Sequence, residues 1–396
     1  MNVALDSSPL EEIRTPLLDI MARNDIGSDR ESPMDAAFKA ELIKWGQAVR
    51  DNPKDRYCVD WAKFLYSPRV PSGFYQSGAE IAENLFSGIS DTSYNIPASE
   101  VSFLERNIKA LQNFFSIARK SKKNGIVHVS MGCGPYPSIS SKDLIFARAC
   151  EAQEYIAFDI NAGFALSGAS LIQQRIPTLT AKYIVGDFTK PFDLTSYTNN
   201  KLVVMTLFGD TIGQHPISYK NDNGLFSQSV SLEKLLVNFG KATNFEALLL
   251  ATVDSETDPP SAEAKYQGRG MKKLMHALWG TAKEITGDRN FNPQAFTYRA
   301  EYDQKMKAVL FVHTATQCTS LTIDGIQYSI PKKTEVVIGC SQKTEPKDLE
   351  SSWINAGWNQ VQFPFNYDST TRAILLAGEK IPKGCTRHCV SKALSM

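Results

Sequence analysis

VHVSMGCGPYP at residues 127–137, AFDIN at 157–161 and VGDF at 185–188 are the stretches that decide the fold. Each of them places a glycine turn or a carboxylate directly after a short apolar run. In an open α/β sheet, nucleotides bind at this point, where the strands end. The order of these signals therefore predicts that an adenosine-containing ligand lies across the ends of neighbouring strands.

The apolar runs around these signals predict a parallel sheet. They are continuous rather than alternating, and they fall at Ile126–Met131, Tyr155–Asp159, Tyr183–Gly186, Leu202–Phe208 and Ala247–Val253. Strands that helices bury on both faces have this pattern. We therefore predict an α/β fold with a doubly wound, Rossmann-like sheet.

The alternation of strands and helices breaks down between about residues 258 and 345. A helical stretch around Lys272–Thr286 is followed by strand-like runs at 307–313, 318–323, 326–330 and 334–340. This change of pattern predicts a second, mixed α+β unit inserted into the sheet domain. A helix after Pro346 and a strand at Ala373–Ala377 then predict a return to the sheet.

The segments before the sheet predict a tail and two helices. Residues 1–31 are polar and carry few large apolar groups, so we expect them to be disordered. Ser32 and Pro33 begin a helix with an apolar stripe, which ends at Asn52-Pro53. Ser99 is the expected N-cap of a second helix, whose apolar face carries Leu104, Ile108, Leu111 and Phe115.

The composition excludes several classes of partner. With 43 Lys and Arg against 42 Asp and Glu, the chain has no net field to attract nucleic acid or an acidic membrane surface. No apolar run is long enough to span a membrane, and no signal peptide is apparent. The seven scattered cysteines lack metal-ligand spacing and predict reduced thiols without a metal site. We expect a cytoplasmic protein, present as a monomer or weak homodimer.

The residues at the strand ends suit a nucleoside. Gly132 and Gly134 allow the backbone to approach a ligand closely, and the helix that follows offers N–H groups to an anionic end. Asp159 can accept both hydroxyls of a ribose. Asp187 can accept from an adenine amine, while Phe188 covers the ring.

A rarer motif, MTLFGDTIGQHP at 205–216, follows the fourth strand. It places Gly209, Asp210, Thr211 and Gly213 where the sheet opens toward a substrate. Gln214 can present its amide to an amine or a carboxylate. His215 is a candidate base, although a surface histidine in a loop is the interpretation that we favour. No Ser/His/Asp or Cys/His set indicates a nucleophile.

The order GCG, FDIN, VGDF, LFGDTIGQ and EAKYQG resembles the histidine N-alpha-methyltransferase family of ergothioneine biosynthesis. Members of this family use S-adenosylmethionine to methylate the alpha-amine of an amino acid. The resemblance covers roughly residues 70–380. It implies a class I methyltransferase core with a second domain built from the amino-terminal segment and a long insertion.

This resemblance implies a division of the chain into five parts. The expected parts are a tail at 1–31, the amino-terminal helical part of the substrate domain at 32–99, the methyltransferase core at 100–257, the inserted substrate-binding part at 258–342, and a return to the core with a tail at 343–396.

The resemblance also implies roles for single residues. Gly132, Gly134 and Gly209 would lie along S-adenosylmethionine, Asp159 would bind its ribose, and Asp187 with Phe188 its adenine. Tyr266 and Ser341 fall on residues that contact the substrate, with Thr211 and Gly339 beside them. Tyr75 and Tyr94 fall on tyrosines of the amino-terminal lid, and with Gln214 they are the expected catalytic groups that orient the amine.

Three departures from the family pattern change the expected substrate. Pro135-Tyr136-Pro137-Ser138 stands where the family has a lysine after the glycine turn. Gln214 replaces an asparagine that holds the substrate amine. Gly339 replaces an acidic residue that recognises imidazole, and the lost charge-assisted hydrogen bond is worth about 1.5–3 kcal/mol. We therefore expect a small amine or amino-acid substrate other than histidine.

Other functions remain open on the sequence. The GPYP stretch is also similar to nicotianamine synthases, which transfer the aminocarboxypropyl arm of the same cofactor or cyclise it. A catalytically silent S-adenosylmethionine-binding protein is a second alternative. A nicotinamide-dependent oxidoreductase is disfavoured, because the turn lacks the third glycine of GxGxxG.

Overall fold

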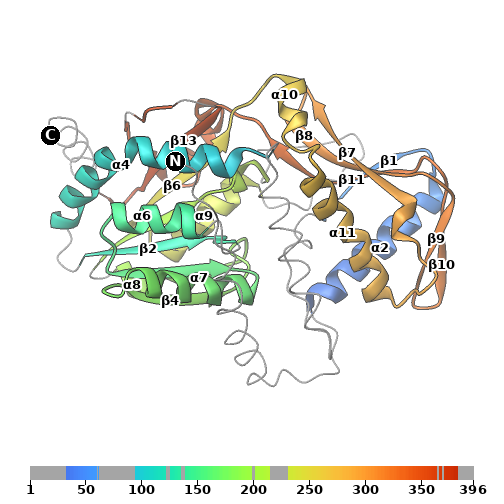
Figure 1. The fold of residues 1–396 in the computed structure, drawn as a ribbon, viewed down its shortest axis with the longest axis horizontal. Helices are drawn as coiled ribbons and strands as arrows, with labels where there is room; N and C mark the ends of the chain where they lie inside the picture. Colours follow the sequence, from blue (N-terminus) through green and yellow to red (C-terminus); the bar gives the residue numbers. More distant parts are fainter. Residues whose placement is uncertain are drawn as a thin grey trace, which may run out of the picture.

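The computed structural model describes residues 33–59, 61, 94–121, 125–134, 139–198, 201–214, 231–363, 365–367 and 370–381. These residues form two larger sheets, each with its own helices, which lie side by side in Figure 1. The predicted tail at 1–31, Tyr75 and the stretch Pro135–Ser138 lie outside the described residues.

The first sheet has seven strands in the order β12-β13-β6-β5-β2-β3-β4. The parallel strands are β2 (Ile126–Met131), β3 (Glu154–Asp159), β4 (Thr180–Val185), β5 (Leu202–Leu207) and β6 (Ala247–Asp254). The predicted strands are confirmed, with small shifts at their ends. β13 (Thr371–Gly378) and β12 (Trp358–Gln360) are antiparallel, so the sheet is parallel only in part.

Helices cover both faces of this sheet. Alternate residues of β5 point to opposite sides: Val204 packs with Leu111 and Phe115 of α4 (Ile96–Ser121), and Val203 packs with Phe239 of α9 (Leu232–Ala242). The remaining elements of this unit are the π-helix η2 (Ile139–Asp143), α6 (Leu144–Ala149), α7 (Ala162–Arg175), α8 (Thr195–Thr198), η3 (Thr211–Gln214), η5 (Pro346–Leu349) and α12 (Glu350–Asn355).

Two details of the prediction are wrong. The helix expected to be capped by Ser99 begins at Ile96, and the Ser99 N–H donates to the carbonyl of Asn95 inside it. Pro97 does not prevent this, because the first turn of a helix needs no N–H from that position. The strand at Tyr183 is not buried on both faces: β4 is an edge strand, and Tyr183 is 49% exposed.

The second sheet has four strands in the order β1-β11-β8-β7. They are β1 (Arg56–Cys58), β11 (Glu335–Gln342), β8 (Ala308–Ala315) and β7 (Phe296–Asp303). β1 pairs in parallel with β11, so the amino-terminal segment joins the inserted one in a single sheet. A separate hairpin consists of β9 (Thr319–Ile323) and β10 (Ile326–Ile330).

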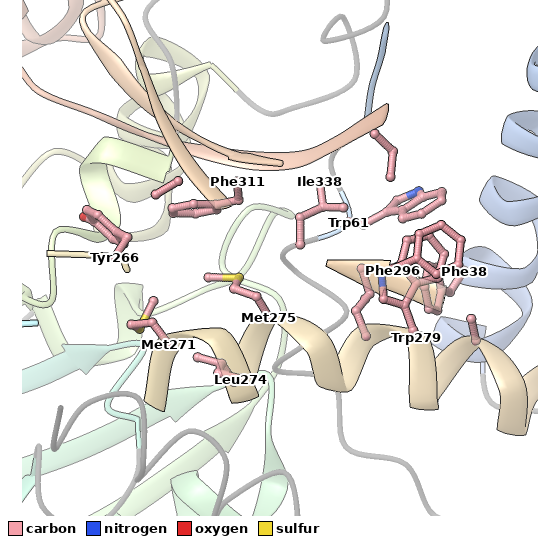
Figure 2. Packing of buried hydrophobic residues seen from close by; sticks show 14 of the residues in the cluster. Phe38, Trp61, Tyr266, Met271, Leu274, Met275, Trp279, Phe296, Phe311 and Ile338 are labelled. Atoms are coloured by element: carbon pink, nitrogen blue, oxygen red, sulfur yellow. The ribbon is translucent and has the colours of Figure 1, made fainter. Parts of the chain in front are cut away.

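Helices α2 (Pro33–Asp51) and α11 (Arg269–Thr286) pack on one face of this second sheet; α10 (Pro259–Ala264) and η4 (Pro293–Ala295) complete the unit. Figure 2 shows Met275 and Trp279 of α11 pointing toward the strands. The Trp279 ring stacks on Phe296 with centroids 3.8 Å apart, and Trp45 and Trp61 pack around it. None of the described helices is long and apolar enough to span a membrane.

Candidate functional site

The glycine turn after β2 has the backbone conformation that its sequence predicts. Gly132 and Gly134 have φ of +71° and +69°, a region that other residues rarely adopt. The Gly134 N–H donates to Asp159 Oδ2 at 2.9 Å. The turn after β2 and the carboxylate at the end of β3 are therefore held together at the carboxyl edge of the sheet.

Asp159 is buried, and backbone groups fix its carboxylate. Its Oδ1 accepts from the Asn161 N–H at 2.8 Å, and burial raises its pKa. Asn161 in turn caps α7 by accepting from the N–H groups of Gly163 and Phe164. Each carboxylate oxygen has two lone pairs, so Oδ1 keeps acceptor capacity for a hydroxyl.

Asp187 and Phe188 form the turn after β4. Asp187 accepts from the N–H of Thr189 at 2.9 Å and also from its hydroxyl. The Phe188 ring packs edge-to-face on Phe158, and a methyl group added to Gly132 would lie 3.3 Å from it. The three signals quoted from the sequence thus meet at one edge of the sheet.

The loop after β5 has a strained backbone, and a buried glutamate of α4 accepts a hydrogen bond from it. Gly209 and Asp210 both have positive φ, of +81° and +55°. The Gly209 N–H donates at 2.6 Å to Glu100 of α4, which also accepts from the Thr252 hydroxyl. Lys142 of η2 pairs with the other oxygen of Glu100 at 2.7 Å. Glu100 therefore connects this loop to the segment that follows the glycine turn.

Asp210 is the centre of a buried ion network. Its Oδ2 accepts from Lys343 Nζ at 3.0 Å and from the Ser341 hydroxyl at 2.6 Å, and Oδ1 accepts from the Asp254 N–H. Lys343 also lies 3.1 Å from Asp254, and Lys265 pairs with Asp254 at 2.8 Å. Burial lowers the pKa of Lys343, but the two aspartates outweigh it and raise that pKa above its usual value. The network holds two anions and two cations, so it is balanced in charge.

Tyr266 joins this network to the second sheet. Its hydroxyl donates to Ser341 Oγ at 2.9 Å and accepts from Lys343 at 2.8 Å, and burial raises its pKa well above the usual value. The Tyr94 ring packs edge-on against Tyr266 at 5.5 Å, and Phe311 packs at 5.3 Å on it. We call Asp210, Asp254, Tyr266, Ser341, Lys265 and Lys343 the junction network.

The other predicted substrate residues lie around this network. Thr211 uses its hydroxyl within the loop, where it donates to the Phe208 carbonyl at 2.8 Å. Gly213 packs so tightly that an added methyl group would lie 2.8 Å from Asp210 Oδ1. Gly339 is buried at an irregularity of β11, where the register shifts between Val337 and Cys340. Gln214 ends η3, but its side chain and His215 lie outside the description.

Sequence reasoning missed Lys343, Lys265, Glu100 and Lys142. A signal existed for Lys343, because it lies two residues after Ser341, which was already a candidate. Lys265 directly precedes the predicted Tyr266. Glu100 and Lys142 carried no such signal, since neither lies beside a predicted site residue.

The fold and this site define the class of protein. The seven-stranded sheet is partly parallel and carries glycine turns and carboxylates along one edge, where the second unit joins it. This is the fold of a class I S-adenosylmethionine-dependent methyltransferase. Over residues 74–377 the sequence matches the family described as histidine-specific, S-adenosylmethionine-dependent methyltransferases. The chain belongs to this family.

Comparisons with solved structures return distant methyltransferases. The CcbJ methyltransferase from Streptomyces caelestis is 10% identical with a TM-score of 0.33, over 69% of this chain and 90% of that chain. The sugar N-methyltransferase KedS8 from Streptoalloteichus sp ATCC 53650 is 7% identical with a TM-score of 0.34, over 75% of this chain and 93% of that chain. Comparison with curated proteins gives no significant match.

The residues at the sheet edge fit S-adenosylmethionine. Asp159 keeps acceptor capacity beside the glycine turn, as a ribose requires. A methyl group added at Gly209 would meet only Lys142 Nζ and Thr211 Oγ1, both at 3.8 Å, so side chains do not crowd this backbone. Gly132, Gly134, Asp159, Asp187, Phe188 and Gly209 are the residues that would hold the cofactor.

Proposed function

We propose that this methyltransferase acts on the amine of a small amino acid or an amino-acid-derived metabolite other than histidine. The observation that carries this proposal is the hydrogen-bonded chain from Tyr266 through Ser341 to Asp210, with distances of 2.9 and 2.6 Å. It connects the two side chains expected to bind the substrate, Tyr266 and Ser341, with the loop after β5. This loop lies at the edge of the first sheet where we expect the cofactor.

A division of labour between the two sheets is part of the proposal. Residues 100–257 and 343–396 would serve as the cofactor core, and residues 32–99 and 258–342 as the substrate domain. The parallel pairing of β1 with β11 supports this division, because it unites the amino-terminal and inserted segments in one sheet.

The chemistry asks the protein for alignment more than for reactive groups. S-adenosylmethionine supplies a methyl group that its sulfonium already activates. The protein residues must hold a neutral amine in line with that methyl group and exclude water. Tyr266 and Ser341 would bind the acceptor's carboxylate, while Tyr75, Tyr94 and Gln214 would orient its amine.

Gly339 and the charge balance of the junction network disfavour histidine as substrate. A glycine offers no carboxylate to an imidazole N–H, and a charge-assisted hydrogen bond of that kind is worth about 1.5–3 kcal/mol. The aspartates of the junction network do not replace it, because Lys265 and Lys343 already pair with them. The site therefore suits an acceptor without a basic side chain.

The test is methyl transfer to a broad panel of amino acids and amines, followed by mass spectrometry. We expect a monomethylated or further methylated amine together with S-adenosylhomocysteine, and little product from histidine. Methylthioadenosine as the by-product would indicate aminocarboxypropyl transfer instead. If no amine in the panel gains a methyl group, the proposed function is wrong.

A matched pair of variants tests the acceptor role of Tyr266. Tyr266→Phe should lower kcat/KM by about 10–100-fold, the worth of a hydrogen bond to a charged group, and leave the affinity for S-adenosylhomocysteine unchanged. Tyr367→Phe is the control, because its hydroxyl bonds the Ala373 carbonyl outside the junction network. Equal kinetics of the two variants would remove Tyr266 from the acceptor site.

A further inference from the structure

Among the described residues of the second unit, three side chains that lie close together each carry a buried polar atom without a hydrogen-bond partner; elsewhere in the unit Trp45, Arg56, Trp61 and Thr334 carry such atoms too. The three are Tyr298 on β7, His313 on β8 and His276 on α11, and the unpaired atoms are the Tyr298 hydroxyl and Nε2 of both imidazoles. Among the described residues nothing accepts from these atoms or donates to them. We call these side chains the unpaired triad.

The triad lies between the second sheet and α11. Tyr298 and His313 are directly opposite in the register of β7 and β8, and their ring centroids are 5.5 Å apart. His276 is close enough to His313 for its charge to lower the pKa of that imidazole further, beyond the larger effect of burial.

Trp279 fixes the proton of His313. The indole Nε1 donates to His313 Nδ1 at 2.8 Å, so Nδ1 is the acceptor of the ring. The imidazole is neutral, because burial lowers its pKa to about 3. Its proton therefore sits on Nε2, which becomes a fully buried N–H donor without an acceptor.

Such groups are costly and need an explanation. A buried donor without a partner has lost its water and gained nothing in return. Here two of them, on Tyr298 and His313, face the same side of one sheet, and the Tyr298 hydroxyl can either donate or accept. An oxygen atom from outside the chain would satisfy both.

The triad adjoins the junction network. Phe311 precedes His313 by two residues on the same face of β8, and its ring contacts Tyr266 at 5.3 Å. Tyr298 is also close enough to Tyr266 to raise the pKa of that phenol, although burial is the larger cause. The face of the sheet thus runs from Tyr266 across Phe311 to the triad.

We propose that the unpaired triad binds the far end of the acceptor's side chain, and that this end is an uncharged group bearing an oxygen, such as a phenol. This inference rests on the proposed function, because it assigns the other end of the same acceptor to Tyr266 and Ser341. Neither neutral imidazole supplies a counter-charge, so a carboxylate or an ammonium is disfavoured at this place.

A pair of amino acids that differ by one hydroxyl tests the inference. The melting temperature of the protein with S-adenosylhomocysteine is measured against rising concentrations of L-tyrosine and of L-phenylalanine. We expect wild-type protein to bind tyrosine at least about tenfold more tightly, since a site built to bond a hydroxyl rejects the analogue that lacks it. Tyr298→Phe should bind the two amino acids equally.

Stability without amino acid separates binding from structure. Tyr298→Phe should melt at the wild-type temperature or above it, because the variant removes an unpaired hydroxyl. Tyr57→Phe, in β1 of the same sheet, is the control: its hydroxyl donates to backbone carbonyls, so the variant should melt lower and keep the preference for tyrosine.

Equal binding of both amino acids by wild-type protein, or binding of neither, would overturn the inference. A lower melting temperature of Tyr298→Phe would also overturn it, since the hydroxyl would then have a structural partner. These outcomes differ from failure of the proposed function, in which no amine of the wider panel is methylated.

Discussion

The junction network and the unpaired triad adjoin each other, and they treat buried polar groups in opposite ways. In the junction network, Lys343 contacts two aspartates, a serine and a tyrosine, and the charges balance. In the triad, Tyr298 and His313 keep atoms without a partner among the described residues. Paired groups hold a structure together, whereas unpaired groups reduce its stability. This contrast is the reason for assigning a structural role to the ion pairs of the first set, beside the acceptor contacts proposed for Tyr266 and Ser341, and ligand binding alone to the second.

The largest effect is expected from breaking the junction network. Lys343→Met leaves Asp210 and Asp254 buried with one cation fewer, and removing one partner of a buried pair costs about 3–5 kcal/mol. We expect the free energy of unfolding in urea to fall by that amount.

Lys307→Met is the control, because Lys307 pairs with Asp348 at 3.6 Å on the surface. Exposed pairs contribute about 0–1 kcal/mol. If the two variants were equally stable, the junction network would have no structural role, and the contrast with the triad would disappear.

A second test concerns the edge of the first sheet where we expect S-adenosylmethionine to bind. Asp187→Ala should weaken the binding of S-adenosylhomocysteine by about 10–100-fold, because it removes the carboxylate that we propose accepts from the adenine amine. Calorimetric titration measures this. Asp193→Ala is a close match, since Asp193 makes the same two bonds to Thr195 that Asp187 makes to Thr189. Unchanged affinity of Asp187→Ala would overturn the adenine assignment.

The neutral imidazole of His313 predicts a loss of stability in acid. Its pKa is about 3 in the folded protein against 6.5 ordinarily, so the unfolded chain binds a proton first as the pH falls. The contribution of His313 to the free energy of unfolding is fully present above pH 6.5. Below pH 6.5 this free energy falls by about 1.4 kcal/mol per pH unit, because the unfolded chain binds a proton that the folded protein does not. His313→Asn should show a shallower slope of unfolding free energy between pH 6.5 and 5.

Other groups also titrate between pH 6.5 and 5. Their contributions to the slope are the same in wild type and in His313→Asn, so they cancel when the two slopes are compared. His128, buried in the first sheet, has a pKa of about 3 and acts in the same direction. Burial raises the pKa of Asp143 to about 6, so its contribution is present in acid and is lost as the pH rises. Identical slopes for wild type and His313→Asn would mean that His313 is not held neutral.

The smallest effects come from two glycines. Gly209→Ala forces a side chain onto φ +81° and should cost about 1 kcal/mol. Gly280→Ala in α11 has nothing within 4 Å of the new methyl group and should stabilise by about 0.5–1 kcal/mol. Thermal unfolding of both variants checks the opposite signs. A neutral Gly209→Ala would show that the loop after β5 relaxes freely.

The cofactor edge could be predicted because its signals are local. Continuous apolar runs such as Ile126–Met131 indicate buried parallel strands, and the two glycines after this run have the positive φ that the turn requires. β7 was missed, because its sequence FTYRAEYD mixes polar and aromatic residues in a half-buried strand. Asp159 ends β3 and Asp187 lies two residues after β4, so the sequence places both carboxylates without any tertiary information.

The junction network could not be predicted, because its members meet only through the fold. Lys343 and Asp210 are separated by 133 positions, and Ser341 and Asp210 by 131. No local pattern tells which buried aspartate a distant lysine neutralises. The triad was equally hidden, since the absence of a partner is visible only when every neighbour is known.

The parallel pairing of β1 with β11 also sets an order of events during synthesis. Arg56–Cys58 emerges from the ribosome early, but its partner Glu335–Val337 emerges near the end of the chain. The five parallel strands of the first sheet are complete by Asp254, so they can pair while the second sheet still lacks its central strands. Closing such a long loop is slow. The half proposed to bind the acceptor is therefore expected to form against parallel strands that are already paired, and β12 and β13 then complete the first sheet.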